Sequence, residues 1–284
     1  MSRVGVVGCG LMGSGIAEVC ARAGLDVVVR EVDAGAAEAG QKRLTTSLDR
    51  GVRTGKLSED VRDVALGHVT FTTDFAELAD RQLVVEAVVE DEQSKVDVFR
   101  ALDEVVTDPA AILASNTSSI PIMKLGIATK RPEQVIGIHF FNQVPVLRLV
   151  ELVTSLMTSQ ETITAADHFA TDVLGKKVIR SQDRAGFVVN ALLIPYILSA
   201  IRMMESGFAT ADDIDTGMVE GCYHPMGPLR LIDLIGLDTT QAVAASLYEE
   251  FKEPLYAPPP LLSRMVDAGL LGRKTGRGFY EYAK

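Results

Sequence analysis

A glycine-rich loop near the N-terminus constrains the fold more than any other feature of this sequence. Residues 4–8, VGVVG, are predicted to form a short strand. Its last residue, Gly8, begins the glycine spacing G-x-G-x-x-G, which leads into an amphipathic helix. In such a loop the first glycine allows a tight turn, the second lets the backbone approach a pyrophosphate, and the third lets the helix pack closely. The helix N-terminus favours the negative charge of the ligand. The loop residues expected to contact a dinucleotide are Gly8, Gly10, Leu11, Met12 and Gly13.

The end of the next predicted strand supports this interpretation. On its own, the glycine pattern also fits a plain strand-to-helix turn. Here residues 26–30 form a second apolar run, and Glu31 follows 23 residues after Gly8, near the usual spacing of the acid that binds the adenosine ribose. A carboxylate repels a 2′-phosphate, so the sequence favours NAD over NADP as the cofactor. The neighbouring Arg30 could reach such a phosphate, which leaves NADP possible.

Short β-branched runs alternate with helical stretches through roughly the first two thirds of the chain. Most of these runs are apolar on both faces, as strands of a parallel sheet covered by helices are. We therefore expect an α/β fold with a Rossmann-type, mostly parallel sheet. From about residue 183 the β signal fades, so we expect residues 1–182 to form the NAD-binding domain and residues 183–284 to form a helical domain. The predicted strands are residues 4–8, 26–30, 83–89, 110–115 and 135–141.

Charge and composition exclude several classes of protein. The net charge is −10 and the pI is near 5.0, which argues against a general nucleic-acid or anionic-membrane surface. The longest apolar run, residues 187–201, is shorter than the roughly 20 residues that a membrane span needs, and no apolar signal region precedes the glycine loop. Three cysteines without CxxC spacing and four histidines without metal-ligand spacing predict neither a disulfide framework nor a metal site, and they fit a cytoplasmic protein.

An anionic ligand of such an acidic chain needs a local group of cations. The segment RGVRTGK offers Arg50, Arg53 and Lys56 after the second predicted strand and its helix. We therefore expect Arg53 and Lys56 to bind an anionic substrate. The alternative is an ordinary solvated basic turn.

Polar residues follow two of the predicted strands. The segment SNTSS, residues 115–119, comes directly after the apolar run AAIL. Ligands of an open parallel sheet bind beyond the carboxyl ends of its strands, so Ser118 is a candidate for contact with a ligand. The alternative is that Ser118 or Ser119 caps a helix beginning near Pro121. Residues 88–91, VVED, end a neighbouring strand with two acids, and a lysine follows; the alternative there is a solvated helix start with an ion pair.

A histidine and a glutamate in the next strand region suggest acid–base chemistry. His139 lies within the predicted strand 135–141, so the backbone rather than a mobile loop places it. Glu151 interrupts the apolar run LVELV, where an unpaired carboxylate would be costly to bury. Pairing with His139 would remove this cost. A histidine oriented by a carboxylate is a suitable base for taking the hydroxyl proton of an alcohol during hydride transfer.

Together these segments resemble a known family. GCGLMGSGIA, VVEAVVED, ASNTSS, IGIHFFNQVPV, LVELV, DRAGFVVNALLIPY, HPMGP, LIGLDT and GRKTGRGFYEY follow in the order found in the 3-hydroxyacyl-CoA dehydrogenases, and the similarity is greatest to the bacterial 3-hydroxybutyryl-CoA dehydrogenases. The resemblance implies a Rossmann-type NAD-binding domain and an all-helical C-terminal domain that forms a homodimer and contributes to the substrate site. It also implies reversible oxidation of an L-3-hydroxyacyl-CoA to the 3-ketoacyl-CoA.

The resemblance also assigns roles to particular residues. The catalytic histidine falls on His139 and its carboxylate partner on Glu151. The serine that contacts the reacting oxygen of the substrate falls on Ser118, and an asparagine that polarises the same region falls on Asn190. Residues that resemble the lining of the nicotinamide half of the cofactor site are Glu90, Lys95 and Asn116.

The segment after the histidine departs from the family at one position. Asn142 is expected near the substrate, whereas Gln143 stands where the family usually carries proline. This difference puts the rigidity of the backbone beside the pocket in doubt, but it affects no catalytic group.

Two other interpretations compete with this one. The 6-phosphogluconate-like dehydrogenases begin with a similar glycine loop but carry a catalytic lysine in the interdomain helix, where this chain has Asn190 and no lysine. The other interpretation is a non-catalytic binding protein with the same fold, like the lens crystallin that resembles this family. The presence of both His139 and Glu151 argues against it.

Overall fold

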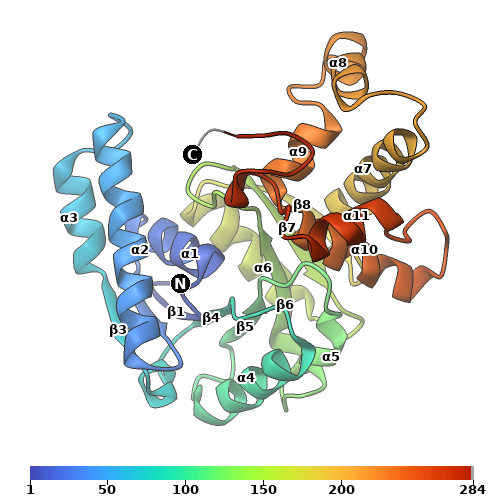
Figure 1. The fold of residues 1–284 in the computed structure, drawn as a ribbon. Helices are drawn as coiled ribbons and strands as arrows, with labels where there is room; N and C mark the ends of the chain where they lie inside the picture. The colour runs from blue at the N-terminus through green and yellow to red at the C-terminus, as the bar shows by residue number, and fades with distance from the viewer. Residues whose placement is uncertain (283–284) are drawn as a thin grey trace. The chain divides into compact units, whose positions relative to one another are not determined.

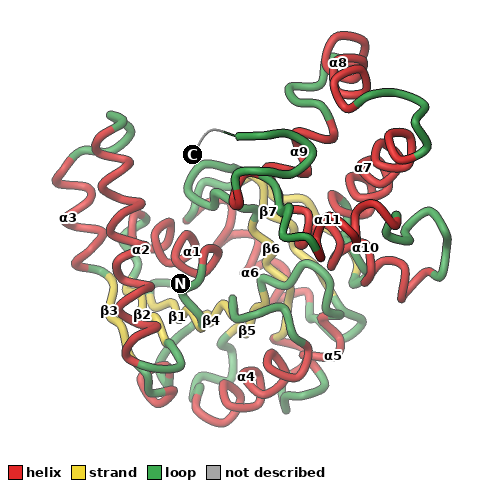
Figure 2. The backbone as a smooth tube through the Cα atoms, viewed as in Figure 1, coloured by secondary structure: helices red, strands yellow, loops and turns green. Residues whose placement is uncertain are grey.

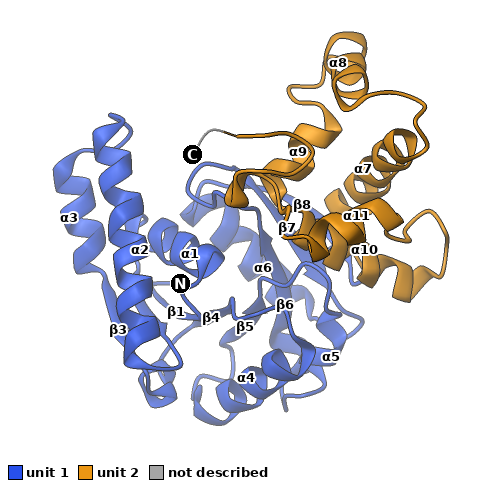
Figure 3. Ribbon diagram, viewed as in Figure 1, with its two compact units in different colours: residues 1–184 blue, residues 185–284 orange. Residues whose placement is uncertain are grey.

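The computed structural model describes residues 1–282, in which the chain forms two compact units (Figure 3). The first unit is Met1–Arg184, and the second begins at Ala185. The first contains a single 8-stranded sheet, whereas the second is built from helices (Figure 2). The predicted fold class, a mostly parallel Rossmann-type sheet followed by a helical region, is therefore confirmed.

The sheet has the strand order β3-β2-β1-β4-β5-β6-β7-β8 (Figure 1). Neighbouring strands are parallel except for the antiparallel pair β6 and β7. The chain runs outward from β1 in both directions, and ligands bind at such a switch point, beyond the carboxyl ends of the strands. The strands are β1 (Arg3–Val7), β2 (Asp26–Arg30), β3 (Val69–Thr72), β4 (Leu83–Glu86), β5 (Ile112–Ser115), β6 (Val135–Phe140), β7 (Leu149–Thr154) and β8 (Lys177–Gln182).

Three strands were not among the predicted ones. β3 and β8 form the two edges of the sheet, and their residues are only partly buried or exposed, so neither has the continuous apolar run of a central strand. β7 has a buried apolar core, but a glutamate interrupts it. The predicted strand at residues 83–89 ends earlier, at Glu86.

Helices cover both faces of the sheet. Ile16 of α1, Phe169 after α6, and the strand residues Val6 and Ile138 share one buried cluster. α4 and α5 lie on the opposite side of the sheet (Figure 1). Strands that are buried on both faces account for the near-continuous apolar runs in the sequence. The helices are α1 (Leu11–Arg22), α2 (Ala34–Arg53), α3 (Glu59–Gly67), α4 (Glu92–Val105), α5 (Ile122–Gly126) and α6 (Gln160–His168), with the helical turns η1 (Phe75–Leu78), η2 (Pro132–Gln134) and η3 (Phe169–Val173).

The second unit packs around its first helix. Ile197 and Ile201 of α7 are fully buried with Ile232 of α9 and Leu247 of α10. Within residues 1–282, no helix has the length and hydropathy that crossing a membrane requires. The helices of this unit are α7 (Val189–Glu205), α8 (Ala211–Cys222), α9 (Pro228–Ile235), α10 (Leu237–Phe251) and α11 (Pro260–Asp267), with the turn η4 (Arg273–Thr275).

Candidate active site

The glycine loop between β1 and α1 has the geometry of a dinucleotide cradle. Gly8 has φ +89°, which favours glycine. A Cβ on Gly13 would lie 1.8 Å from the carbonyl oxygen of Gly8, whereas a Cβ on Gly10 would meet nothing within 4 Å. α1 begins at Leu11 without a side-chain cap and without an acidic residue in its first turn. Its free N–H groups therefore suit the pyrophosphate of a dinucleotide.

Two neighbouring residues at the end of β2 have different partners. The Glu31 carboxylate accepts hydrogen bonds from the backbone N–H groups of Cys9 and Val32, which fix it beside the glycine loop. Arg30 donates from Nε to the Thr73 carbonyl oxygen at 3.3 Å, and its guanidinium lies 4.0 Å from the centroid of the Phe75 ring. Glu31 is thus placed for a ribose hydroxyl, whereas Arg30 is engaged by other groups, which favours NAD over NADP.

His139 lies between a carboxylate and a serine. In the antiparallel pairing of β6 with β7, His139 is directly opposite Glu151, so both side chains lie on one face of the sheet. The distance from His139 Nδ1 to Glu151 Oε2 is 2.7 Å, and that from Nε2 to Ser118 Oγ is 3.1 Å. His139 is 4% exposed and Glu151 is fully buried. With Nδ1 held by the carboxylate, Nε2 is the nitrogen available for proton transfer beside Ser118.

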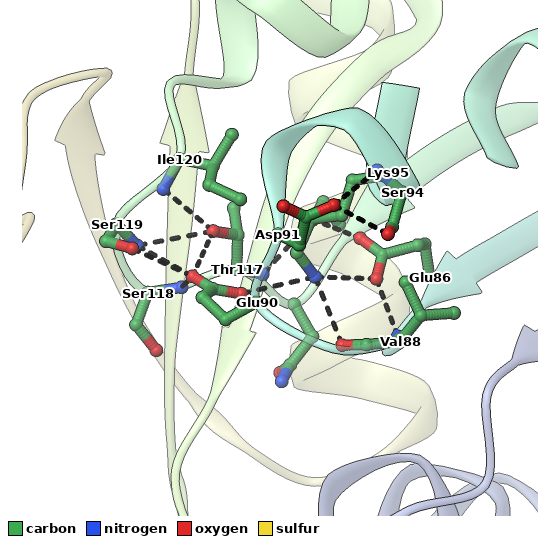
Figure 4. A network of polar contacts seen from close by, with 12 residues as sticks. Glu86, Val88, Glu90, Asp91, Ser94, Lys95, Thr117, Ser118, Ser119 and Ile120 are labelled. Carbon is green, nitrogen blue, oxygen red and sulfur yellow. Dashed lines mark hydrogen bonds and ion pairs between the residues drawn. The ribbon is translucent and has the colours of Figure 1, made fainter. Parts of the chain in front are cut away.

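The loop that carries Ser118 is tied to a second glutamate (Figure 4). Glu90 Oε1 accepts hydrogen bonds from Thr117 Oγ1 at 2.5 Å, from Ser118 N at 2.8 Å and from both N and Oγ of Ser119 at 3.1 and 3.0 Å. Burial alone would raise the pKa of the Glu90 carboxyl, but the Lys95 ammonium and these hydrogen bonds lower it overall. The ionised form of Glu90 therefore fixes the Ser118 backbone.

A different residue caps the helix that follows this loop. α5 begins at Ile122, and the N–H groups of Ile122 and Met123 donate to the Asp183 carboxylate at 2.8 and 2.7 Å. Ser118 and Ser119 direct their polar atoms to other groups. The alternative that one of these serines caps the helix is therefore wrong.

Lys95 has a buried partner that sequence reasoning did not identify. Its ammonium lies 2.6 Å from Glu86 Oε1 and 3.2 Å from Glu90 Oε2. Asp91 instead caps α4 by accepting the Ser94 N–H. The alternative of a solvated helix start is therefore correct for Asp91, but Lys95 is buried and pairs with other carboxylates. Glu86 interrupts the apolar run LVVEAVV in the way that Glu151 interrupts LVELV. A glutamate within an apolar run could therefore have identified Glu86 as a buried carboxylate with a partner.

Asn116 supports β6 from the end of β5. Its side-chain Oδ1 accepts the Phe140 N–H at 2.9 Å, so it fixes the backbone beside His139. Asn190, the other predicted polar residue, lies in the first turn of α7 in the second unit, and its role stays a prediction.

A cavity of about 580 Å³ in the first unit is bordered by α1, α2 and the loop after β6. Lys56, Arg50 and Asn142 line it, whereas Arg53 is not among its lining residues. Gln143 also lines it and has φ +68°, a conformation closed to proline, so the backbone here differs from the one that the family's usual proline would form. The cavity offers cations for a large anionic substrate.

A histidine held by a carboxylate, at the same edge of a Rossmann-type sheet as a dinucleotide loop, is typical of the NAD-dependent dehydrogenases, and the fold and site assign the chain to this class. Comparison with known proteins narrows the assignment. Residues 3–184 match the model of the 3-hydroxyacyl-CoA dehydrogenase NAD binding domain, and residues 186–282 match that of the 3-hydroxyacyl-CoA dehydrogenase C-terminal domain. The chain belongs to the 3-hydroxyacyl-CoA dehydrogenase family, as its sequence motifs predicted.

Similar proteins match along their whole length. A 3-hydroxybutyryl-CoA dehydrogenase of Mycobacterium tuberculosis is 62% identical over 282 residues, which cover 99% of both chains. The crystal structure of FadB2 from M. tuberculosis superposes with a TM-score of 0.99 and covers 100% of this chain and 99% of that chain at 62% identity. The (S)-3-hydroxybutyryl-CoA dehydrogenase PaaH1 of Ralstonia eutropha has a TM-score of 0.94 and 44% identity, with 100% of both chains covered.

Proposed function

We propose that this protein reversibly oxidises L-3-hydroxybutyryl-CoA to acetoacetyl-CoA with NAD. The alcohol loses a hydride from C3 to NAD⁺ and a proton from its hydroxyl group, which yields the ketone, NADH and H⁺. The observation that carries the proposal is the line Ser118–His139–Glu151, in which His139 Nε2 faces Ser118 Oγ at 3.1 Å. His139 takes the hydroxyl proton in oxidation and returns one in reduction, Glu151 orients the imidazole, and Ser118 holds the reacting oxygen.

The cofactor would be held by residues at the carboxyl edge of the sheet. The glycine loop and the first turn of α1 bind the pyrophosphate, and Glu31 binds the adenosine ribose. Glu90, Lys95 and Asn116 line the nicotinamide half, and bound NAD supplies the hydride acceptor. Asn190 is expected, from the family resemblance alone, to polarise the region of the substrate oxygen.

A direct assay tests this function. NADH mixed with the protein and acetoacetyl-CoA should lose its nicotinamide absorbance, and L-3-hydroxybutyryl-CoA with NAD⁺ should produce it. Turnover of 6-phosphogluconate instead would favour the competing dehydrogenase class. NADH binding without turnover of either substrate would favour a non-catalytic binding protein.

The acyl-CoA phosphates are expected in the basic cavity. Replacing Arg50 and Lys56 together by alanine should raise KM for acetoacetyl-CoA about tenfold with little change in kcat, because such contacts bind ground state and transition state alike. Arg53→Ala is the matched comparison: Arg53 lies on the same segment but not among the lining residues, so its effect on KM should be smaller. An unchanged KM in the double variant would remove this segment from the site.

We also propose a homodimer formed through the second unit, in a cytoplasmic protein. Leu192 on α7 is 73% exposed, and it borders an apolar groove with Tyr196 and Met226. Large exposed apolar patches of this kind commonly mark protein interfaces. Small-angle scattering at micromolar concentration should return twice the chain mass, and Leu192→Asp should lower it toward that of one chain. A wild-type monomer under these conditions would refute the dimer.

A further inference from the structure

The group formed by Glu86, Lys95 and Glu90 joins β4 to α4 (Figure 4). Glu86 is fully buried and Lys95 is 1% exposed, whereas the Glu90 side chain is 40% exposed. A lysine ammonium of this kind is seldom buried without partners. Here it lies between two carboxylates, so the group as a whole carries one net negative charge.

Glu86 is fully hydrogen-bonded and therefore fixed in place. Its Oε1 accepts from Lys95 Nζ at 2.6 Å and from the Val88 N–H at 2.7 Å, and its Oε2 accepts from Ser115 Oγ at 2.6 Å. Ser115 Oγ in turn accepts the Thr117 N–H at 3.1 Å. One buried carboxylate thus connects Lys95 to the loop that carries Ser118.

The other charges of this region are more exposed. Asp91 and Glu92 lie on the surface at the start of α4, and Glu92 forms an ion pair with Lys124 at 2.6 Å. Solvent weakens the field of exposed charges, whereas a buried charge acts at a lower effective dielectric constant. Glu86 therefore has a stronger influence on a neighbouring ligand than these surface acids have.

We propose that Glu86 sets the charge of the cofactor site and so determines the relative affinity of the site for oxidised and reduced nicotinamide. This inference rests on the proposed function, which places the nicotinamide half of NAD at Glu90 and Lys95. The nicotinamide ring is cationic in NAD⁺ and neutral in NADH. A net negative group beside the ring stabilises bound NAD⁺ relative to bound NADH. An unfavourable change in the shape of the site would instead weaken the binding of both forms.

The test measures the dissociation constants of NAD⁺ and NADH by titration calorimetry. Glu86→Gln keeps the shape of the side chain but makes the group neutral. It should raise the ratio of Kd for NAD⁺ to Kd for NADH by roughly 5- to 30-fold, the effect of one charge acting over about 8 to 15 Å at an effective dielectric constant of about 20. Glu92→Gln removes an equal charge from the start of α4, but from an exposed ion pair, and should change the ratio by less than about twofold.

A compensating variant separates charge from structure. Glu86→Gln combined with Lys95→Met leaves only the Glu90 charge, which restores one net negative charge, so the ratio should return to within about threefold of the wild-type value. If Glu86→Gln alone does not fold, the same one-charge step is measured between the wild type and Glu86→Gln combined with Lys95→Arg, in which the guanidinium keeps Glu90 as its partner and no buried carboxylate is left unpaired. An equal loss of affinity for both forms in Glu86→Gln, or in the second comparison, would show that Glu86 serves structure only and would overturn the proposal.

The outcome for the proposed function is read separately. Wild-type turnover of acetoacetyl-CoA is measured on the same preparation. A shifted binding ratio in a protein that does not turn over acyl-CoA would leave this inference standing and refute the substrate assignment. Turnover of acetoacetyl-CoA with an unchanged binding ratio in Glu86→Gln would support the substrate assignment and refute this inference.

Discussion

Replacing His139 with alanine is expected to lower kcat by roughly 10²- to 10⁴-fold while NADH binding stays nearly intact. The expectation follows from the position of the imidazole, whose Nε2 faces Ser118 while Nδ1 contacts a buried carboxylate. Removal of the ring takes away the proton acceptor but leaves the glycine loop and Glu31 unchanged. Steady-state kinetics with acetoacetyl-CoA and NADH titration of the same variant would measure both quantities.

A second histidine–carboxylate pair provides the control. His168 Nδ1 lies 2.6 Å from Asp172 Oδ2, but this pair is exposed at the end of α6. His168→Ala removes the same kind of pair from the surface and should leave kcat within about twofold, as surface substitutions usually do. If His139→Ala kept more than a tenth of wild-type kcat, another group would have to move the proton.

The direction of the reaction determines how its rate depends on pH. Oxidation requires a neutral imidazole at His139, and reduction requires an imidazolium. Oxidative kcat/KM should therefore rise with increasing pH, while reductive kcat/KM falls over the same range. Because oxidation releases a proton and reduction consumes one, the overall equilibrium also contributes to this opposite behaviour. The pH profiles of His139→Ala, measured beside those of the wild type, show how much of each trend the imidazole causes.

Much of the fold was predictable because local patterns determine it. The glycine spacing and the acid at Glu31 indicated the dinucleotide loop, and the continuous apolar runs indicated a buried parallel sheet. The edge strands β3 and β8 were missed because their residues are only partly buried or exposed. An edge strand is defined by pairing with a distant neighbour, and its own residues give a weak signal.

The candidate site was predictable only in part, because it depends on contacts between distant residues. His139 and Glu151 are distant along the chain. The register of β6 and β7, in which the two residues are directly opposite, brings their side chains together. The role of Glu86 depends on a lysine in α4 and a serine in β5, so no single sequence pattern shows it. The cavity likewise separates Lys56 from Arg53, although the two lie on the same short segment.

The contribution of Glu151 should be large and should depend on His139. Glu151→Gln keeps the size of a fully buried side chain but removes the charge that orients the imidazole and stabilises its protonated form. We expect kcat to fall by roughly 10- to 10³-fold. Asp172→Asn makes the same kind of change in the exposed pair and should leave kcat within about twofold.

Because Glu151 acts through His139, their effects should not add. The double variant His139→Ala with Glu151→Gln should be little slower than His139→Ala alone, since the carboxylate has no imidazole left to orient. Thermal unfolding of each variant checks that the sheet is intact, because β6 and β7 are interior strands that pair with each other. If the two losses multiplied, Glu151 would be a structural carboxylate that supports the pairing of β6 and β7 without acting on the proton transfer.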